Sequence, residues 1–246
     1  MSGFANVILP GKRKASLVIV ANNRTRIALP KGIRPERIVH MIENGVDEAI
    51  FANDRSPDTP ITPFCFVYIG RLVDWKMIDI IIAAMDHLPA QYTLEIVGDG
   101  PMLEPLTQQV HAAKLVNRVT FRGLLSQKEC AVALARSVAL VLPSIYECGG
   151  AVAIEAMAMA TPVIATRWGG PEDYITDGED GILITPNSRD DMVIGFARAM
   201  RTLGNDPVRA REMGQAGRVK AIKTFSWSSK IDAILELYER ALVTVD

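Results

Sequence analysis

Two glutamates, Glu147 and Glu155, flank the start of an alanine-rich segment. Gly149 and Gly150 follow the first of them, and glycine allows the backbone to turn sharply or to approach a ligand closely. The second lies among the apolar residues 152–157, where an unpaired carboxylate would be costly. A helix that starts here would offer free N–H groups and a positive dipole end, which suit a phosphate. The segment therefore predicts a site for a charged sugar derivative, with two solvated glutamates as the alternative.

Arg71 and Lys76 are the basic side chains that could share this ligand. They follow the continuous apolar segment 64–69, which has the length of a strand, and Gly70 lies at the junction. Ligands of doubly wound sheets bind at the carboxyl ends of the strands, which is where these residues fall. An arginine can also hold a phosphate through two hydrogen bonds. For two isolated basic residues, a solvated surface pair is the alternative.

Alternating strands and helices must position these residues, and their order predicts an α/β fold with a doubly wound, Rossmann-like parallel sheet. The expected strands are 64–69, 91–97, 118–121, 138–142, 162–165 and 182–184. The expected helices are 76–88, 102–115, 126–135, 151–160, 191–203 and 228–243, with one more that opens at Asp206 or Pro207. Right-handed crossovers bring all the strand ends to one edge. One ligand at that edge could contact Arg71, Gly98, Glu147 and Gly169.

Several motifs in one order give the sequence a family resemblance. The pair Glu147 and Glu155 resembles the Glu-x7-Glu signature of the retaining family 4 glycosyltransferases (glycosyl transferases group 1). The other motifs are Gly70-Arg71 with Lys76, VGDGP at 97–101, FRG at 121–123, and GGPE with DGEDG between 169 and 181. The resemblance covers roughly Ile42 to the C-terminus, and it implies the C-terminal, donor-binding domain of a GT-B enzyme.

The same resemblance implies a division of the chain. Residues 1–60 are expected to be a remnant of the N-terminal acceptor domain plus the hinge, and the sequence Asn44-Gly45-Val46-Asp47 resembles that hinge. Residues 61–246 are expected to form the nucleotide-sugar donor-binding domain and its C-terminal helices. The proline-rich segment 57–63 between them has the composition of a linker.

Each candidate residue acquires a role from this resemblance. Arg71 and Lys76 would hold the pyrophosphate of the donor and Glu147 would hold hydroxyls of its sugar, so these three are the expected catalytic residues. Glu155 would accept hydrogen bonds from the ribose, and the base would lie near the loop at Arg122. The expected donor-binding residues are Gly70, Gly98, Arg122, Gly149, Gly150, Ala151 and Glu155.

The implied activity is retaining transfer of a hexose from a UDP-, GDP- or ADP-sugar to a hydroxyl of a glycan, a lipid-linked acceptor or a polysaccharide precursor. The chain has no Asp-x-Asp triplet, so we expect no metal and no cofactor beyond the nucleotide-sugar co-substrate. Basic side chains and the helix N-terminus would stabilise the leaving diphosphate instead. A sugar-nucleotide epimerase and a donor-binding module that is inactive on its own remain open. A glycosidase ranks lower, because it has no use for Arg71 and Lys76.

The composition is that of an ordinary soluble globular protein, with 246 residues, 49% apolar and 22% charged residues, and a net charge of −1. Such a balance argues against a partner nucleic acid. Residues 1–40 carry eight basic residues against Glu36 alone, which favours a solvated face and leaves peripheral contact with anionic lipid or with a phosphorylated acceptor open. Three widely spaced cysteines predict neither zinc nor a disulfide.

The chain shows no apolar segment long enough to cross a bilayer and no secretory signal pattern, so we expect a cytoplasmic protein, with the inner face of the membrane as an alternative. The last expected helix carries apolar side chains that need a partner. A missing N-terminal domain or a homodimer would bury them. They are Ile231, Ile234, Leu235 and Leu237.

Overall fold

A six-stranded parallel sheet organises most of the chain in the computed structural model, which describes residues 11–51, 62–147 and 149–243. Apart from the edge strand β5, its strands run through apolar segments that are buried over most of their length, as expected for a sheet covered on both faces. The strands are β3 Cys65–Ile69, β4 Thr93–Val97, β5 Val119–Gly123, β6 Ala139–Leu142, β7 Val163–Thr166 and β8 Gly181–Ile184. The predicted doubly wound α/β fold is confirmed.

The spatial order of the strands is β5-β4-β3-β6-β7-β8, and every neighbouring pair is parallel. The chain therefore builds outward from β3 in one direction, and then outward from β6 in the other. The order reverses between β3 and β6, and this switch point is where open α/β sheets bind their ligands. The loops that follow β3 and β6 therefore flank the expected binding position.

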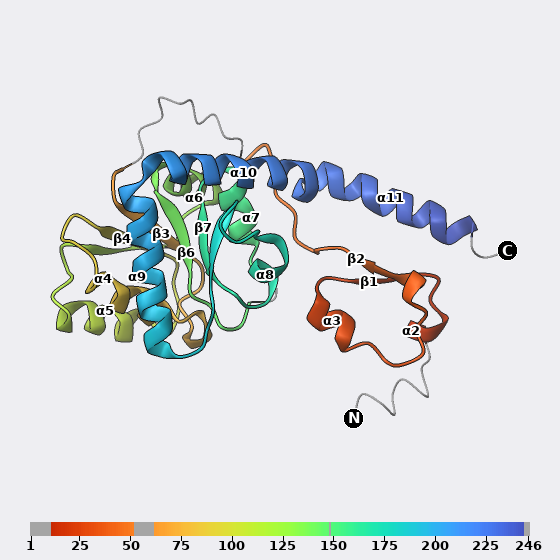
Figure 1. Ribbon diagram of the computed structural model, residues 1–246, viewed down its shortest axis with the longest axis horizontal. Coiled ribbons are helices and arrows are strands. Elements are labelled where there is room, and N and C mark those ends of the chain that lie inside the picture. The colour runs from red at the N-terminus through yellow and green to blue at the C-terminus, as the bar shows by residue number, and fades with distance from the viewer. Residues whose placement is uncertain (1–10, 52–61, 148, 244–246) are drawn as a thin grey trace.

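Helices cover both faces of this sheet (Figure 1). Helices α4, α5 and α9 pack together on one face, whereas α6 and α7 cover the other and α10 packs on α7. The elements are η2 Asp74–Lys76, α4 Ile78–Met85, α5 Leu103–Ala112, α6 Gln127–Arg136, α7 Ala151–Ala158, α8 Gly170–Tyr174, α9 Arg189–Asn205, α10 Pro207–Phe225 and α11 Trp227–Val243.

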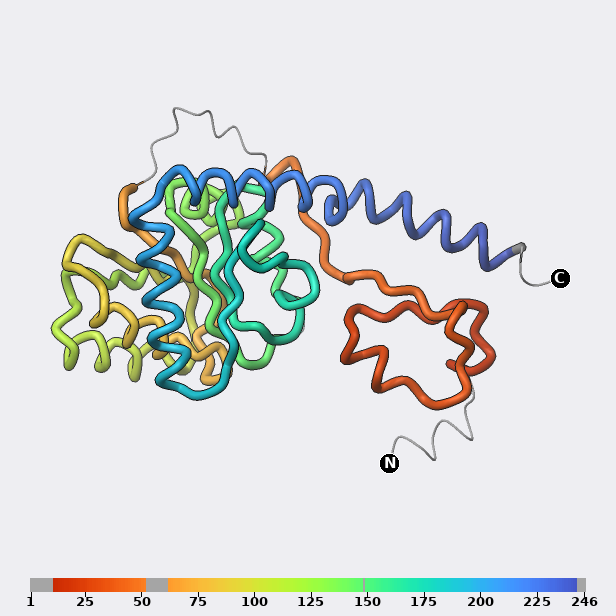
Figure 2. Tube along the Cα trace, viewed as in Figure 1, coloured from red at the N-terminus to blue at the C-terminus, as the bar shows by residue number. Residues whose placement is uncertain are grey.

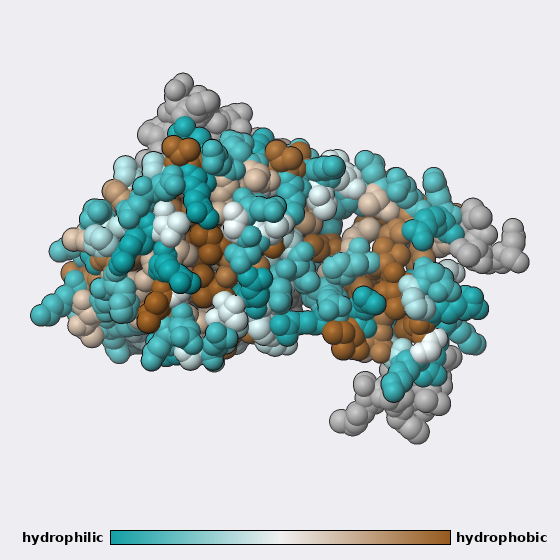
Figure 3. Space-filling view, in the orientation of Figure 1, coloured by the Kyte–Doolittle hydropathy of each residue, from teal (hydrophilic) through white to brown (hydrophobic). Residues whose placement is uncertain are grey.

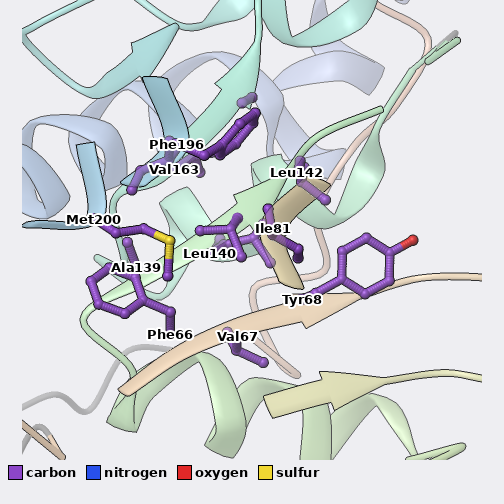
Figure 4. Close-up of a cluster of buried hydrophobic side chains, with 14 of the residues drawn as sticks. Phe66, Val67, Tyr68, Ile81, Ala139, Leu140, Leu142, Val163, Phe196 and Met200 are labelled. Carbon is purple, nitrogen blue, oxygen red and sulfur yellow. The ribbon is translucent and has the colours of Figure 1, made fainter. Parts of the chain in front are cut away.

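The core lies between the central strands and these helices. Figure 4 shows side chains of β3, β6 and β7 meeting those of α4 and α9, among them Phe66, Leu140, Val163, Ile81, Phe196 and Met200. All six are at most 1% exposed. A close-packed core directly beneath the sheet edge gives the loops at that edge a rigid base.

Capping residues set several helix boundaries. Ser126 forms a capping box with Glu129 at the start of α6, and Ser188 caps α9. Asp206 caps α10, with a proline at its first position. The helix expected from Lys76 begins later, at Ile78, because Met77 has a left-handed backbone (φ 51°) and Lys76 belongs to the short η2 turn. Lys76 thus lies in the loop and not on a helix.

A small N-terminal unit precedes the sheet. Strands β1 Val18–Val20 and β2 Ile38–His40 pair in parallel, and they are joined through α3 Asn23–Ile27 and the turn η1 Pro35–Arg37. Helix α2 Gly11–Lys14 precedes β1. Asn22 caps α3 by accepting a hydrogen bond from the Thr25 N–H at 2.8 Å.

The chain passes between the N-terminal unit and the sheet domain twice, once near Val46 and once near Trp227, and the two segments lie side by side. The Val46 N–H donates to the Phe225 carbonyl at 2.8 Å, and the Trp227 N–H donates to the Val46 carbonyl at 3.2 Å. The Trp227 ring lies against Gly45, where an added Cβ would come within 2.7 Å of it. The predicted hinge is therefore paired with the start of α11. The predicted boundary at residue 60 and most of the 57–63 linker lie outside the described residues.

Helix α11 leaves the sheet domain and runs beside the N-terminal unit (Figures 1 and 2). Its residue Lys230 donates a hydrogen bond to the Ile42 carbonyl, and burial lowers the pKa of this lysine. Apolar residues gather where the helix and the unit face each other (Figure 3). Leu237 is buried, but Ile231 and Leu235 are more than half exposed, so the expected burial of these two is absent here. Self-association through them stays a prediction.

None of the helices in the described part of the chain has the length and apolarity needed to span a membrane.

Candidate functional site

Lys76 and Glu147 meet at the switch point of the sheet. The Lys76 ammonium donates to the Glu147 carboxylate, and the two side chains are only 19% and 11% exposed. One residue comes from the loop after β3 and the other from the loop after β6, 71 positions apart in sequence. The ammonium has three N–H donors, so one contact with Glu147 leaves two for a phosphate.

The two loops are also joined through their backbones. The Ile145 N–H donates to the Trp75 carbonyl at 3.1 Å, directly beside the Lys76–Glu147 pair. Two buried tyrosines lie close enough to feel the charge of Glu147. Burial chiefly, and then the negative charge of Glu147, raise the pKa values of Tyr68 and Tyr174. Both phenols therefore stay protonated and act as hydrogen-bond donors.

Glycines let neighbouring loops at this edge touch. Gly98 has a φ of 134°, and an added Cβ would lie 1.9 Å from the Gly70 carbonyl oxygen. Gly169 has a φ of 69°, and its Cβ would lie 1.9 Å from the carbonyl oxygen of Glu147. Both positions exclude any side chain. Gly70 and Gly98 thus join the loops on one side of the switch point, and Gly169 supports Glu147 on the other.

Helix α7 begins beside Glu147, as predicted. Gly150 caps it with a left-handed backbone (φ 60°) and no capping side chain, and Ala151 is its first residue. The Tyr174 hydroxyl lies 3.0 Å from the Gly149 carbonyl and 2.9 Å from the Gly150 carbonyl, which holds this turn on α8. The N–H groups at the start of α7 are consequently fixed in direction, which is the arrangement that favours an anion.

Glu155 lies one turn into α7 and is half-buried. Burial raises the pKa of its carboxyl group, and within the described chain no cation forms an ion pair with it. A desolvated carboxylate with free acceptor atoms suits hydroxyl donors such as those of a ribose. The sequence-based prediction that Glu155 lies on or near a buried helix agrees with this environment.

Neutralising Glu155 is expected to stabilise the protein and weaken its ligand binding. Because its folded-state pKa is raised, the group favours folding when protonated and opposes it as pH rises and the buried carboxylate ionises. The Tm of Glu155→Gln relative to the unsubstituted protein should therefore increase from pH 4 to pH 8. Glu155→Ala should weaken nucleotide binding about ten- to a hundredfold, since charged hydrogen bonds contribute about 1.5–3 kcal/mol.

Calorimetry at both pH values, with the exposed Glu212→Ala as control, checks this prediction. A Tm difference that is flat with pH would contradict the environment assigned to Glu155. An unchanged dissociation constant would remove Glu155 from the site.

The two candidate arginines are placed differently from Lys76. Arg71 follows β3 at the expected edge, but its side chain is exposed and forms no ion pair with a described residue. Arg122 is the extra residue of a bulge in β5, where Phe121 and Gly123 oppose consecutive residues of β4. Its guanidinium lies 3.8 Å from Glu95, a carboxylate that Arg136 also binds. Roles for both arginines in donor binding stay predictions.

Three contacts at the site were not expected from the sequence. Asn44 of the hinge places its amide where a Cβ on Gly149 would meet it at 2.0 Å. Tyr174 holds the glycine turn, and the ring of Trp168 packs against Tyr146. The sequence placed Asn44 in the hinge, but it carried no signal that the hinge touches the start of α7.

The fold and this edge together define a doubly wound α/β domain with a cation and a carboxylate at its switch point, and with a helix start that has no capping side chain beside them. This is the position at which open α/β sheets bind their ligands. Residues 50–220 match the family described as Glycosyl transferases group 1. The chain belongs to this family.

Curated relatives carry related names. A glycogen synthase of Mycobacterium tuberculosis is 33% identical over 204 residues, which are 81% of this chain and 48% of that protein. An alpha-maltose-1-phosphate synthase of Mycolicibacterium smegmatis is 30% identical over 223 residues, covering 84% of this chain and 57% of that protein. The chain thus spans about half the length of these relatives.

Solved structures share the GT-B fold. HepE of Anabaena in complex with UDP is 25% identical with a TM-score of 0.83, over 97% of this chain and 67% of that one. Sucrose-phosphate synthase of Thermosynechococcus elongatus is 27% identical with a TM-score of 0.80, over 99% and 63% of the two chains.

Proposed function

We propose that this chain is the donor-binding part of a retaining glycosyltransferase that moves a hexose from a nucleoside-diphosphate sugar to a hydroxyl acceptor. The observation that carries the proposal is the meeting of Lys76 and Glu147 at the switch point, beside the start of α7. The similarity to an Anabaena protein in complex with UDP supports a uridine nucleotide as the first donor to test.

In this proposal the diphosphate lies between Lys76 and the N-terminus of α7. As the glycosidic bond breaks, negative charge builds on the leaving phosphate, and a fixed ammonium and fixed N–H groups stabilise it without reorganisation. Glu147 orients Lys76 through their ion pair and accepts hydrogen bonds from sugar hydroxyls. Glu155 accepts hydrogen bonds from the ribose. Residues 1–60 would be the remnant of the acceptor-binding domain, and residues 61–246 the donor domain.

A calorimetric panel of UDP, GDP, ADP and their glucose conjugates tests the proposal. At least one nucleotide should bind and raise the Tm, because a ligand that binds only the folded state stabilises it. Affinity should be the same with and without EDTA, since side chains and backbone supply the positive charge. Failure of every nucleotide to bind would overturn the donor site. A nucleotide affinity that is lost in EDTA would show that donor binding requires a metal ion, against this proposal.

A further inference from the structure

An aromatic surface adjoins the candidate donor site. Tyr146 immediately precedes Glu147 and is 60% exposed. Its ring lies 5.2 Å from that of Trp168, centroid to centroid, at an interplanar angle of 37°. Trp168 in turn immediately precedes Gly169, which packs on the Glu147 backbone. Both rings are therefore fixed relative to Glu147, and we call Tyr146 and Trp168 the aromatic shelf.

The shelf lies where the N-terminal unit meets the sheet domain. Arg24 of α3 places its guanidinium carbon 4.5 Å from the centre of the Trp168 ring, and it lies 3.5 Å from the Glu172 carboxylate of α8. Figure 1 shows α3 on the side of the N-terminal unit that faces α8. One face of Trp168 is thus covered by a cation, while the exposed ring of Tyr146 remains open to a ligand.

Packing does not explain an exposed tyrosine at this place. A ring with this much exposed surface gains little from burial in the folded chain. Tyr146 also lies next to the residue that would hold the donor sugar, so a second substrate must pass close to it. For transfer, the acceptor hydroxyl has to approach to about 3–3.5 Å from the reacting carbon of the donor.

We infer that the aromatic shelf binds a pyranose ring of a carbohydrate acceptor. The inference rests on the proposed function and specifies the acceptor class. A pyranose presents a flat face of C–H groups that packs on an aromatic ring, and hydroxyls around its rim that need polar partners. Arg24, which lies over the Trp168 ring, and its partner Glu172 supply such partners beside the shelf.

The surroundings of the shelf discriminate between acceptor classes. An acyl chain would need a continuous apolar groove, whereas the Arg24–Glu172 pair beside these rings carries both signs of charge. A polyanionic acceptor would meet the Glu172 carboxylate. A neutral sugar satisfies both the rings and the mixed charges, so an oligosaccharide is the occupant that fits.

Titration of neutral tetrasaccharides into the UDP-saturated protein tests the inference. The probes are maltotetraose, cellotetraose and α-1,6-mannotetraose, each followed by calorimetry. At least one should bind, and Tyr146→Ala should weaken it about three- to tenfold, the expected loss of one aromatic stacking contact. Tyr146→Phe keeps the ring and should retain the affinity. UDP affinity should change less than about twofold in both variants.

Tyr238→Ala is the matched control, because Tyr238 is 63% exposed and lies on α11, away from the loops that follow β6 and β7. An equal loss in this control would overturn the shelf, as would an unchanged affinity in Tyr146→Ala or no binding of any tetrasaccharide when UDP binds. The protein could instead bind vesicles of phosphatidylcholine and phosphatidylglycerol in a way that depends on Tyr146. That result would overturn the sugar as the occupant of the shelf and assign the shelf to a lipid surface. If UDP itself does not bind, the proposed donor site is wrong, and the assignment of the shelf to an acceptor is overturned together with it.

Discussion

Replacing Lys76 with methionine is expected to cost the protein both stability and transfer. The methionine leaves the Glu147 carboxylate without its cation in a place where only 11% of that side chain is exposed. Breaking a buried ion pair from one side costs about 3–5 kcal/mol when the remaining charge cannot reach water. We therefore expect a Tm lower by about 6–20 °C, at roughly 2–4 °C for each kcal/mol in a domain of this size.

The transfer rate should fall further than stability alone explains. Lys76 is the cation that the proposed mechanism places at the leaving diphosphate, and removal of one such group typically slows catalysis by about 10²–10³-fold. Release of nucleotide from the donor that binds most tightly, measured with and without an acceptor, reports this loss. The exposed Lys223→Met on α10 is the matched control and should behave like the unsubstituted protein.

A double variant separates the two effects. Lys76→Met combined with Glu147→Gln removes both charges, so no buried carboxylate is left unpaired and most of the lost Tm should return. Nucleotide release should stay low, because the cation is still absent. Recovery of both properties would show that Lys76 serves only to hold the loops together, and that outcome would contradict its assignment to the diphosphate.

The sequence predicted the edge of the sheet better than the contacts made there. Continuous apolar segments define parallel strands, and parallel strands with right-handed crossovers place Glu147 and Gly169 at the same edge without any knowledge of strand order. The contact between Lys76 and Glu147 depends on β3 and β6 being neighbours, which joins residues 71 positions apart. Strand order is settled by tertiary packing, and no local pattern encodes it.

Arg122 and Tyr174 also make contacts that the sequence could not predict. Propensity places Arg122 at the end of a strand, but the bulge that pairs it with Glu95 depends on the register against β4. Nothing in the sequence around Tyr174 indicates a polar role, whereas its hydroxyl donates to the carbonyls of the glycine turn before α7. Such contacts depend on how α8 packs. The residues of the site could therefore be predicted from the sequence, whereas the partners that hold them could not.

Replacing Gly169 with alanine should displace Glu147 and lose donor binding. Its φ of 69° is strained for any residue with a Cβ, and that Cβ would lie 1.9 Å from the Glu147 carbonyl oxygen, where the Gly170 N–H also donates at 3.0 Å. Backbone cannot yield like a side chain, so the whole loop must shift. We expect a loss of about 1–3 kcal/mol from overlap, in addition to about 1–2 kcal/mol of backbone strain.

Gly178→Ala isolates the strain, because Gly178 also has a positive φ, 83°, but an added Cβ there has nothing within 4 Å. This control should lose only the roughly 1–2 kcal/mol of the left-handed backbone and keep full nucleotide affinity. Urea unfolding gives the two free energies, and calorimetry with UDP gives the affinities. Equal stability losses in the two variants would mean that the loops after β6 and β7 are not in contact. Intact UDP binding in a folded Gly169→Ala protein would separate Glu147 from the donor, because the shifted loop carries Glu147 with it.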